Sequence, residues 1–166
     1  GVVQSESVQE LLRAGEAFSN LPMPSKGGTA IISNSEGLTS TILQKIDSAE
    51  LSLSKLESST MDDLEALQSA LVAERAAVTC SKDISSMGLD EVFRQIIEDD
   101  NVGSVIAAMT PLSANEKSRM SQVLERISQK HDKPIAVNIP ERDSMDVSSN
   151  VDYLSTLREC VEVLEK

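Results

Sequence analysis

The fold of this chain is decided at Gly28-Thr29-Ala30-Ile31-Ile32-Ser33-Asn34-Ser35-Glu36-Gly37-Leu38-Thr39, a stretch that predicts a buried strand, a tight polar turn and the start of a helix. Its first half is short, β-branched and apolar, which is typical of a strand covered on both faces. Asn34 and Ser35 are residue types that cap helix N-termini, and Gly37 allows another group to approach the backbone closely. A helix that starts at the carboxyl end of a parallel strand directs free N–H groups into the crevice where α/β proteins bind anions. We therefore take Asn34, Ser35, Glu36 and Gly37 as candidate phosphate ligands, against the alternative of an ordinary capped helix start.

The composition is that of a globular domain and argues against a nucleic-acid partner. Of the 166 residues, 40% are hydrophobic and 25% are charged, which suits one domain with its own core. Aromatic residues make up only 2%, so the chain lacks the side chains on which bases stack. The formal net charge of −12 disfavours contact with a phosphate backbone. We expect no nucleic acid among the partners.

The sequence shows no pattern of a membrane protein or a metal site. No apolar run approaches the length of a membrane span, and no charged-then-apolar signal peptide opens the chain. Cys80 and Cys160 are far apart and fit no metal-ligand spacing, so we interpret them as reduced thiols of a cytoplasmic protein. His131 falls between a predicted helix and a predicted strand, where a favourable interaction with the helix C-terminus explains it better than catalysis. We expect no metal site, no membrane contact and a cytoplasmic location.

Strands and helices alternate along the rest of the chain. This alternation predicts an α/β protein with a doubly wound, mainly parallel sheet in a flavodoxin-like three-layer α/β/α fold. The predicted strands cover 29–33, 50–53, 76–80, 104–109 and 134–139, with a further short strand left open at 151–153. The predicted helices cover 38–47, 61–71, 89–98, 114–130 and 154–164, and Thr60 is expected to cap the second of them.

The chain is expected to divide near residue 28. Residues 1–27 read as an N-terminal helix followed by a Pro- and Gly-containing linker, both packing on the domain. Residues 28–166 read as the flavodoxin-like domain itself, with an irregular polar stretch at 141–150.

Several segments, taken in order, carry a family resemblance that covers nearly the whole chain. Together they resemble the NDP-forming acyl-CoA synthetases, the succinyl-CoA-synthetase-like superfamily. Within that superfamily, the match is to the flavodoxin-like CoA-ligase domain that follows the domain holding the catalytic histidine. The segments are 1–24, Thr29–Thr39, Ser81–Ile84, Asp99–Pro111 and Asp132–Val137.

The resemblance implies one domain of a larger machine. Such enzymes interconvert an acyl-CoA, ADP and phosphate with the free acid, CoA and ATP, and a phosphorylated histidine carries the phosphoryl group between sites. The positions matching the family's phosphate-stabilising helix start are Asn34, Ser35, Glu36 and Gly37. The implied partners are CoA-binding, catalytic-histidine and ATP-grasp domains or subunits. CoA and ATP/ADP with Mg are implied for the full-length enzyme, whereas this domain is expected to hold no cofactor and no catalytic residue.

Two departures from the family pattern fall where the crevice is expected. Glu36 replaces the first of two usual glycines, and Ser81-Lys82 replaces the Asn-Pro that normally precedes the family aspartate, here Asp83. A carboxylate at Glu36 would repel an incoming phosphate by on the order of a few kcal/mol at an effective dielectric near 20. Asp83 and Thr110 are further crevice candidates at strand ends, Asp83 being equally consistent with a surface acid.

The departures leave alternatives open. The first expectation is a domain of an acetate-type, ADP-forming acyl-CoA synthetase that is inactive alone. The alternatives are the synthetase-like regulatory region of a protein lysine acetyltransferase, which the Glu36 substitution favours, and a non-catalytic scaffold or binding module. Fold alone does not separate them.

Overall fold

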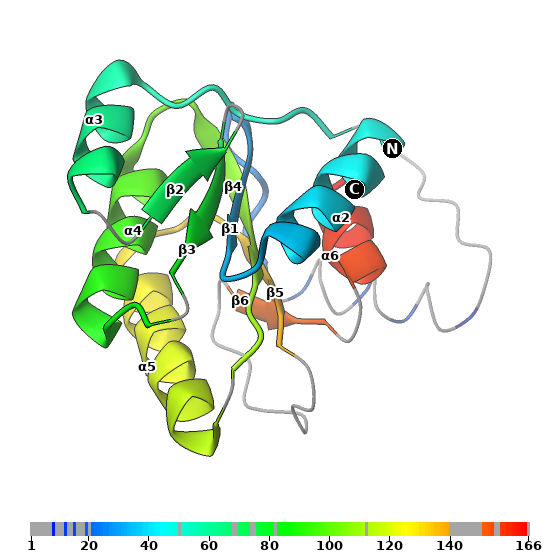
Figure 1. The fold of residues 1–166 in the computed structure, drawn as a ribbon. Helices are drawn as coiled ribbons and strands as arrows, with labels where there is room; N and C mark the ends of the chain where they lie inside the picture. Colours follow the sequence, from blue (N-terminus) through cyan, green and yellow to red (C-terminus); the bar gives the residue numbers. More distant parts are fainter. Residues whose placement is uncertain are drawn as a thin grey trace.

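A single mixed sheet organises the part of the chain that the computed structural model describes, which is residues 8, 12, 15, 19, 21–49, 51–67, 70–73, 76–81, 83–111, 113–139, 151–154 and 157–165 (Figure 1). The strands are β1 (Gly28–Ser33), β2 (Ala70–Ala73), β3 (Ala77–Cys80), β4 (Val102–Ala108), β5 (Ile135–Asn138) and β6 (Val151–Tyr153). The helices are α2 (Glu36–Asp47), α3 (Ser58–Ala66), α4 (Ser86–Glu98), α5 (Ala114–Lys130) and α6 (Leu157–Glu165).

The strand order confirms the predicted fold class. Within the six-stranded sheet the order is β2-β3-β1-β4-β5-β6, and only the β2–β3 pair is antiparallel. The parallel strands, numbered by their sequence, therefore lie in the order 2-1-3-4-5, which is that of a flavodoxin-like fold. The short strand left open at 151–153 exists as β6 and pairs with β5.

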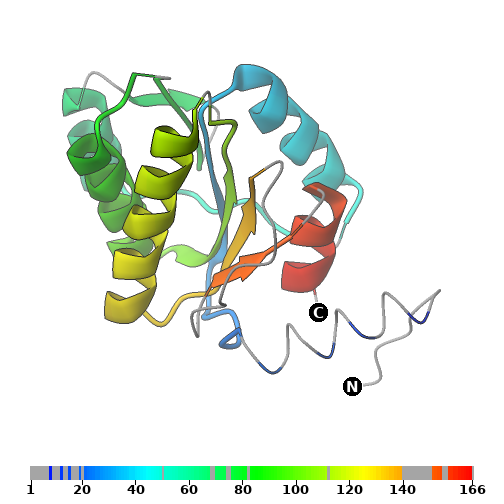
Figure 2. The ribbon, with the colours of Figure 1, turned by 90° about the horizontal axis from the view of Figure 1, so that it is seen from below.

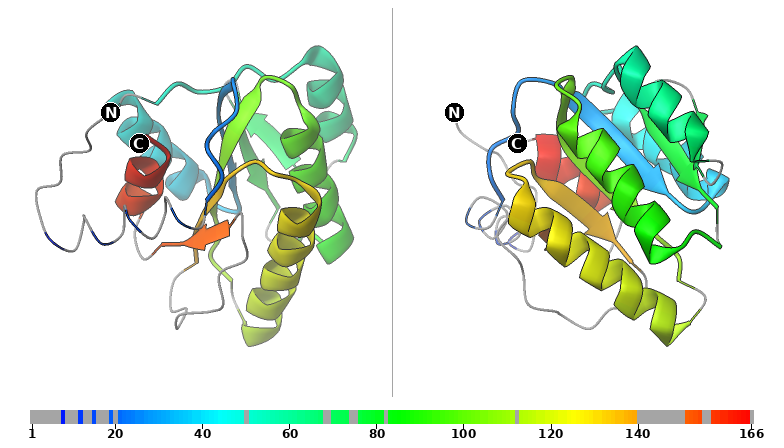
Figure 3. Two further views of the ribbon diagram at one scale, coloured as in Figure 1. Left: turned by 180° about the vertical axis from the view of Figure 1, so that it is seen from behind. Right: turned by 90° about the vertical axis from the view of Figure 1, so that its left-hand side faces the viewer.

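Helices cover both faces of the sheet. Helices α2 and α6 pack on one face, and α3, α4 and α5 lie on the other (Figure 2). Successive residues of β1 serve the two faces, because Ile31 belongs to the core under α2 and α6 while Ile32 belongs to the core under α4 and α5. Figure 3 shows α4 and α5 side by side on the second face.

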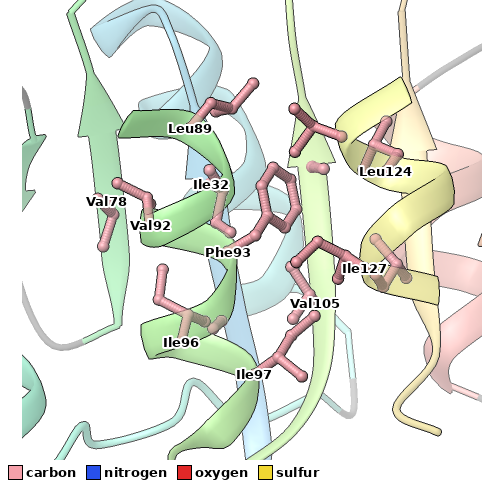
Figure 4. Close-up of a cluster of buried hydrophobic side chains, with 14 of the residues drawn as sticks. Ile32, Val78, Leu89, Val92, Phe93, Ile96, Ile97, Val105, Leu124 and Ile127 are labelled. Atoms are coloured by element: carbon pink, nitrogen blue, oxygen red, sulfur yellow. The ribbon is translucent and has the colours of Figure 1, made fainter. Parts of the chain in front are cut away.

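The larger core is built from aliphatic side chains around one aromatic ring. Phe93 of α4 is fully buried, with Leu124 and Ile127 of α5 on one side and Ile32 and the other strand residues beneath it (Figure 4). The apolar residues of α4 recur at the three- and four-residue spacing of a single helix face. This face covers one side of the strands and α2 and α6 cover the other, which is why the strands are apolar on both sides.

Three local predictions are wrong. The helix expected at 61–71 ends at Ala66, and the apolar run Ala70–Ala73 forms strand β2 because it can pair with β3 in a hairpin. The strand expected at 50–53 is reduced to a single bridge between Thr29 and Leu53, because β3 pairs with β1 from Ile31 onward. Thr60 does not cap α3, since the N-cap is Glu57 and Thr60 is buried inside the helix.

The division near residue 28 stays a prediction. Residues 141–150 and most of 1–20 lie outside the described residues. Val8 and Leu12 are described and are 74% and 63% exposed.

At the amino edge of the sheet, backbone segments pass very close to one another at three glycines. A Cβ on Gly28 would lie 2.4 Å from the Ser54 nitrogen, and one on Gly103 would lie 2.5 Å from the Ser25 oxygen. Gly27 adopts a φ of +152°, which other residues rarely adopt. Gly27 and Gly103 therefore allow the segment before β1 to pass against the start of β4, and Gly28 allows β1 to pass against Leu53 and Ser54.

The acidic pair at this edge divides into one buried and one exposed member. The Asp99 carboxylate is 4% exposed and accepts hydrogen bonds from the Glu57 and Asn101 N–H groups. Asp100 is exposed. Burial lowers the pKa of Lys133, whose ammonium group donates to the Asp99 carbonyl at 2.7 Å.

None of the helices among the described residues is both long and apolar enough to reach across a bilayer.

Candidate functional site

The candidate site lies where the chain leaves β1 and β4 in opposite directions. These strands are neighbours and run parallel, so their carboxyl ends meet at one edge of the sheet. The chain leaves β1 toward α2 on one face and leaves β4 toward α5 on the other (Figure 1). Such a switch in direction opens the crevice in which doubly wound proteins bind ligands.

Asn34 joins the ends of β1 and β4 at this edge of the sheet. Its side-chain Oδ1 accepts a hydrogen bond from the Thr110 N–H at 2.9 Å, and its Nδ2 donates to the Thr110 carbonyl at 3.0 Å. Asn34 is 6% exposed. Its side chain thus adds two buried hydrogen bonds to those that join β1 and β4. Asn34 therefore holds the ends of β1 and β4 together, and its role as a phosphate ligand stays a prediction.

Three buried hydroxyl groups fix the start of α2. Ser33 Oγ lies 2.6 Å from Thr39 Oγ1, which lies 2.9 Å from Thr79 Oγ1 on β3. The Ser35 carbonyl accepts from the Ser33 hydroxyl at 2.9 Å, from the Thr39 hydroxyl at 3.2 Å and from the Thr39 N–H at 3.0 Å. The first turn of α2 is thereby tied to both β1 and β3.

The outer side of the same turn is open. Ser35 is the N-cap residue, but its side chain makes no capping hydrogen bond, whereas Ser85 and Ser113 do cap α4 and α5. The first N–H groups of a helix have no acceptor within the helix, so those of Glu36, Gly37 and Leu38 depend on solvent or a ligand. This arrangement can bind an oxyanion through backbone groups and the helix dipole.

Gly37 and Glu36 are both exposed at this turn. The nearest heavy atom to a Cβ built on Gly37 is the Ser35 Oγ at 3.7 Å, which is ordinary van der Waals contact. The fold therefore tolerates a side chain at Gly37 and does not explain the glycine. Glu36 lies in the first turn of α2, where a carboxylate interacts favourably with the helix dipole.

The remaining predicted residues lie on the same edge, and one further residue belongs with them. Thr110 is exposed and is joined to Asn34 through its backbone, and Asp83 is exposed beyond the end of β3. Asn138, which sequence reasoning missed, ends β5 and donates from its Nδ2 to the Leu154 carbonyl at 3.0 Å. A polar amide directly after an apolar strand was the available signal, and it is the one that identified Asn34.

Nucleophilic and metal chemistry find no support among the described residues. Burial raises the pKa of the Cys80 thiol to about 12, so the thiol stays protonated and unreactive at neutral pH. Cys160 is also buried, and His131 lies between α5 and β5, at the opposite edge of the sheet from Asn34. No group of three or more His, Cys, Asp or Glu within the described ranges could hold a metal ion.

The chain is similar to one curated protein, and no family model matches it. It is 22% identical over 139 residues to the 4-hydroxybutyrate–CoA ligase [ADP-forming] of Nitrosopumilus maritimus (strain SCM1). The similarity covers 84% of this chain and 20% of that protein. This chain therefore spans about a fifth of the length of its curated relative.

Solved structures share the fold over the whole chain. PH0766 from Pyrococcus horikoshii OT3 has a TM-score of 0.79 at 20% identity, covering 99% of this chain and 41% of that one. The dinucleotide-forming acetyl-coenzyme A synthetase 1 of Ca. Korarchaeum cryptofilum, in complex with phosphate and ADP, has a TM-score of 0.76 at 11% identity, covering 99% and 37%. The curated relative confirms the resemblance to the NDP-forming acyl-CoA synthetases that the sequence motifs indicated, and the solved structures confirm the fold.

Proposed function

We propose that this chain is one domain of an ADP-forming acyl-CoA synthetase of the acetate–CoA ligase type. In this role it contributes to the phosphohistidine site and to the interface between domains, and it is inactive alone. The proposal is supported by the curated relative, an ADP-forming CoA ligase of which the chain matches only 20%. The CoA-binding, catalytic-histidine and ATP-grasp domains would be supplied by the rest of the enzyme.

The observation that carries the proposal is the asymmetric start of α2. On its inner side, the buried hydroxyl groups of Ser33, Thr39 and Thr79 fix the turn in place. On its outer side, the turn is uncapped and Gly37 leaves it uncovered. Preorganised N–H groups in such a position stabilise a phosphoryl group without the cost of rearrangement.

Glu36 weakens this site without filling it. The residue is exposed, so its carboxylate can stay in water while the N–H groups bind the anion. Two unit charges at about 4 Å repel by about 1 kcal/mol in bulk water and about 4 kcal/mol at an effective dielectric of 20. Because the carboxylate is exposed, we expect its repulsion of the anion to be nearer about 1 kcal/mol than about 4 kcal/mol.

No residue of this chain is assigned to a cofactor. The described residues include no cluster of acidic or histidine side chains that would fit Mg. Binding of CoA and of ATP or ADP with Mg by other domains stays a prediction from the family resemblance. In the full enzyme these groups would supply the thiol and the phosphoryl group, and this chain's α2 would stabilise the phosphoryl group in transit.

Calorimetric titration of the chain with inorganic phosphate at constant ionic strength tests the proposal. We expect saturable binding in the millimolar range, tightened about two- to fivefold by Glu36→Gly because one repulsive charge is removed. Glu36→Gln separates the charge from the added backbone freedom of glycine. The absence of saturable heat in both the wild type and Glu36→Gly would contradict the phosphate role.

The same titration bears on the alternatives. A synthetase-like regulatory region of a lysine acetyltransferase, or a scaffold module, that has lost the phosphoryl-transfer role needs no anion at α2. Neither alternative explains why the first turn is fixed on its inner side and uncovered on its outer side.

A further inference from the structure

The hydroxyl chain ends on the peptide group that also carries the first outward N–H of α2. The Ser35 carbonyl and the Glu36 N–H belong to one planar trans peptide and point in opposite directions. The groups within hydrogen-bond distance of this carbonyl are the Ser33 hydroxyl, the Thr39 hydroxyl and the Thr39 N–H, at 2.9, 3.2 and 3.0 Å. Fixing the carbonyl therefore fixes the direction of the Glu36 N–H.

Proton counting gives Thr79 a defined part in this arrangement. Each hydroxyl has one proton, and the Thr79 hydroxyl contacts only the Thr39 hydroxyl among the hydrogen bonds of the described residues. In every arrangement that gives all three protons an acceptor, Thr79 donates to Thr39, and the chain of donors ends on the Ser35 carbonyl. Ser33, Thr39 and Thr79 are 0%, 3% and 9% exposed. Water therefore does not readily take the place of a hydroxyl group removed from this chain of hydrogen bonds.

We infer that Thr79 is a positioning residue, which acts through Thr39 and Ser33 to orient and polarise the Ser35–Glu36 peptide so that its N–H faces an anion. Hydrogen bonds in a chain strengthen one another, and a carbonyl that accepts strongly makes the N–H of its own peptide a better donor. Thr79 lies on β3, which is 40 residues from Thr39 in sequence and does not carry the anion site itself. This inference rests on the proposed phosphate role of α2 and assigns that role's geometry to a residue on another strand.

The chain offers a matched control for the test. Thr29 of β1 is a buried threonine whose hydroxyl pairs with Ser104 Oγ at 2.9 Å, at the amino edge of the sheet. Thr79→Val and Thr29→Val each remove one buried hydroxyl from a hydroxyl pair, so both should lose comparable stability. Thr79→Ser restores the hydroxyl that the inference invokes.

The experiment compares these variants with the wild type by amide NMR, first without phosphate and then during titration with inorganic phosphate. We expect Thr79→Val to move the Glu36 amide resonance and to weaken phosphate binding by up to about twofold, because only part of the strength of one hydrogen bond is lost. Thr79→Ser should restore both readouts, and Thr29→Val should change neither. If Thr79→Val leaves the Glu36 resonance and the phosphate affinity as in the wild type, the inference is wrong.

The two proposals fail separately. If the wild type binds no phosphate, the proposed function fails, and the phosphate-free Glu36 resonance still decides whether Thr79 controls the peptide. If the wild type binds phosphate and Thr29→Val weakens binding as much as Thr79→Val, the effect is one of general stability and the positioning role is refuted.

Discussion

Replacing Gly37 by alanine should make the protein more stable and its phosphate binding weaker. The added Cβ would lie 3.7 Å from the nearest heavy atom, so it causes no clash. An exposed helical glycine costs about 0.5–1 kcal/mol relative to alanine, and Gly37→Ala should recover up to that amount. For a chain of this size, 1 kcal/mol corresponds to a rise in Tm of about 2–4 °C.

The opposite effect on binding follows from the direction of a helical side chain. Each Cα–Cβ bond of a helix leans toward the N-terminus, so a methyl group on Gly37 leans over the first N–H groups of α2. Phosphate oxygens must approach those nitrogens to about 3 Å, and the methyl group removes part of that space. We expect phosphate affinity to fall about threefold or more, which corresponds to about 0.7 kcal/mol.

Thermal unfolding and phosphate calorimetry on the same samples measure the two effects. Ser40→Ala is the matched control, because Ser40 is exposed on α2 beyond the first turn and gains helix propensity in the same way. It should raise Tm without changing phosphate affinity. A Gly37→Ala variant that is stabilised but binds phosphate like the wild type would refute the argument that glycine keeps the turn uncovered.

Three further predictions concern stability. Asn34→Ala removes both hydrogen bonds to the Thr110 backbone, so urea unfolding should show a free energy of unfolding lower by about 2–3 kcal/mol. A loss under about 0.5 kcal/mol would contradict a stabilising link between β1 and β4 at Asn34. Gly103→Ala places a methyl group 2.5 Å from the Ser25 oxygen, so it should lower Tm by about 5 °C or more, and an unchanged Tm would show that the amino edge can relax. Because burial raises the folded-state pKa of Cys80 from the ordinary value of 9.0 to about 12, its contribution to stability is complete below about pH 9 and is lost as the pH rises toward 12. Between about pH 8 and 10, the free energy of unfolding measured with urea should therefore fall by about 1 kcal/mol more in the wild type than in Cys80→Ala. Parallel pH profiles of the two proteins would contradict this cause.

The sequence predicted the frame of the site because that information is local. A β-branched run followed by Asn34 and Ser35 is enough to predict a strand that ends at a helix start, and β1 and α2 follow it closely. The apolar runs at 104–109 and 134–139 likewise predicted strands, which β4 and β5 confirm. Alternation of these elements then fixed the fold class.

The sequence could not predict the partners, because they are distant along the chain. Asn34 pairs with a backbone 76 residues away, and Thr39 meets Thr79 across 40 residues. Strand β2 was missed for a related reason, since Ala70-Leu71-Val72-Ala73 continues the apolar spacing of the preceding helix and becomes a strand only by pairing with β3. Pairing of this kind depends on tertiary context, which overrides local propensity.

The measurement that tests the central claim most directly is residue-by-residue mapping of phosphate binding by amide NMR. The account predicts that the Glu36, Gly37 and Leu38 amides shift together and saturate at one phosphate concentration, while Gly103 at the opposite edge stays unchanged. A titration in which these three amides do not respond, or respond only in step with resonances at the amino edge, would contradict the claim that α2 begins with a phosphate site.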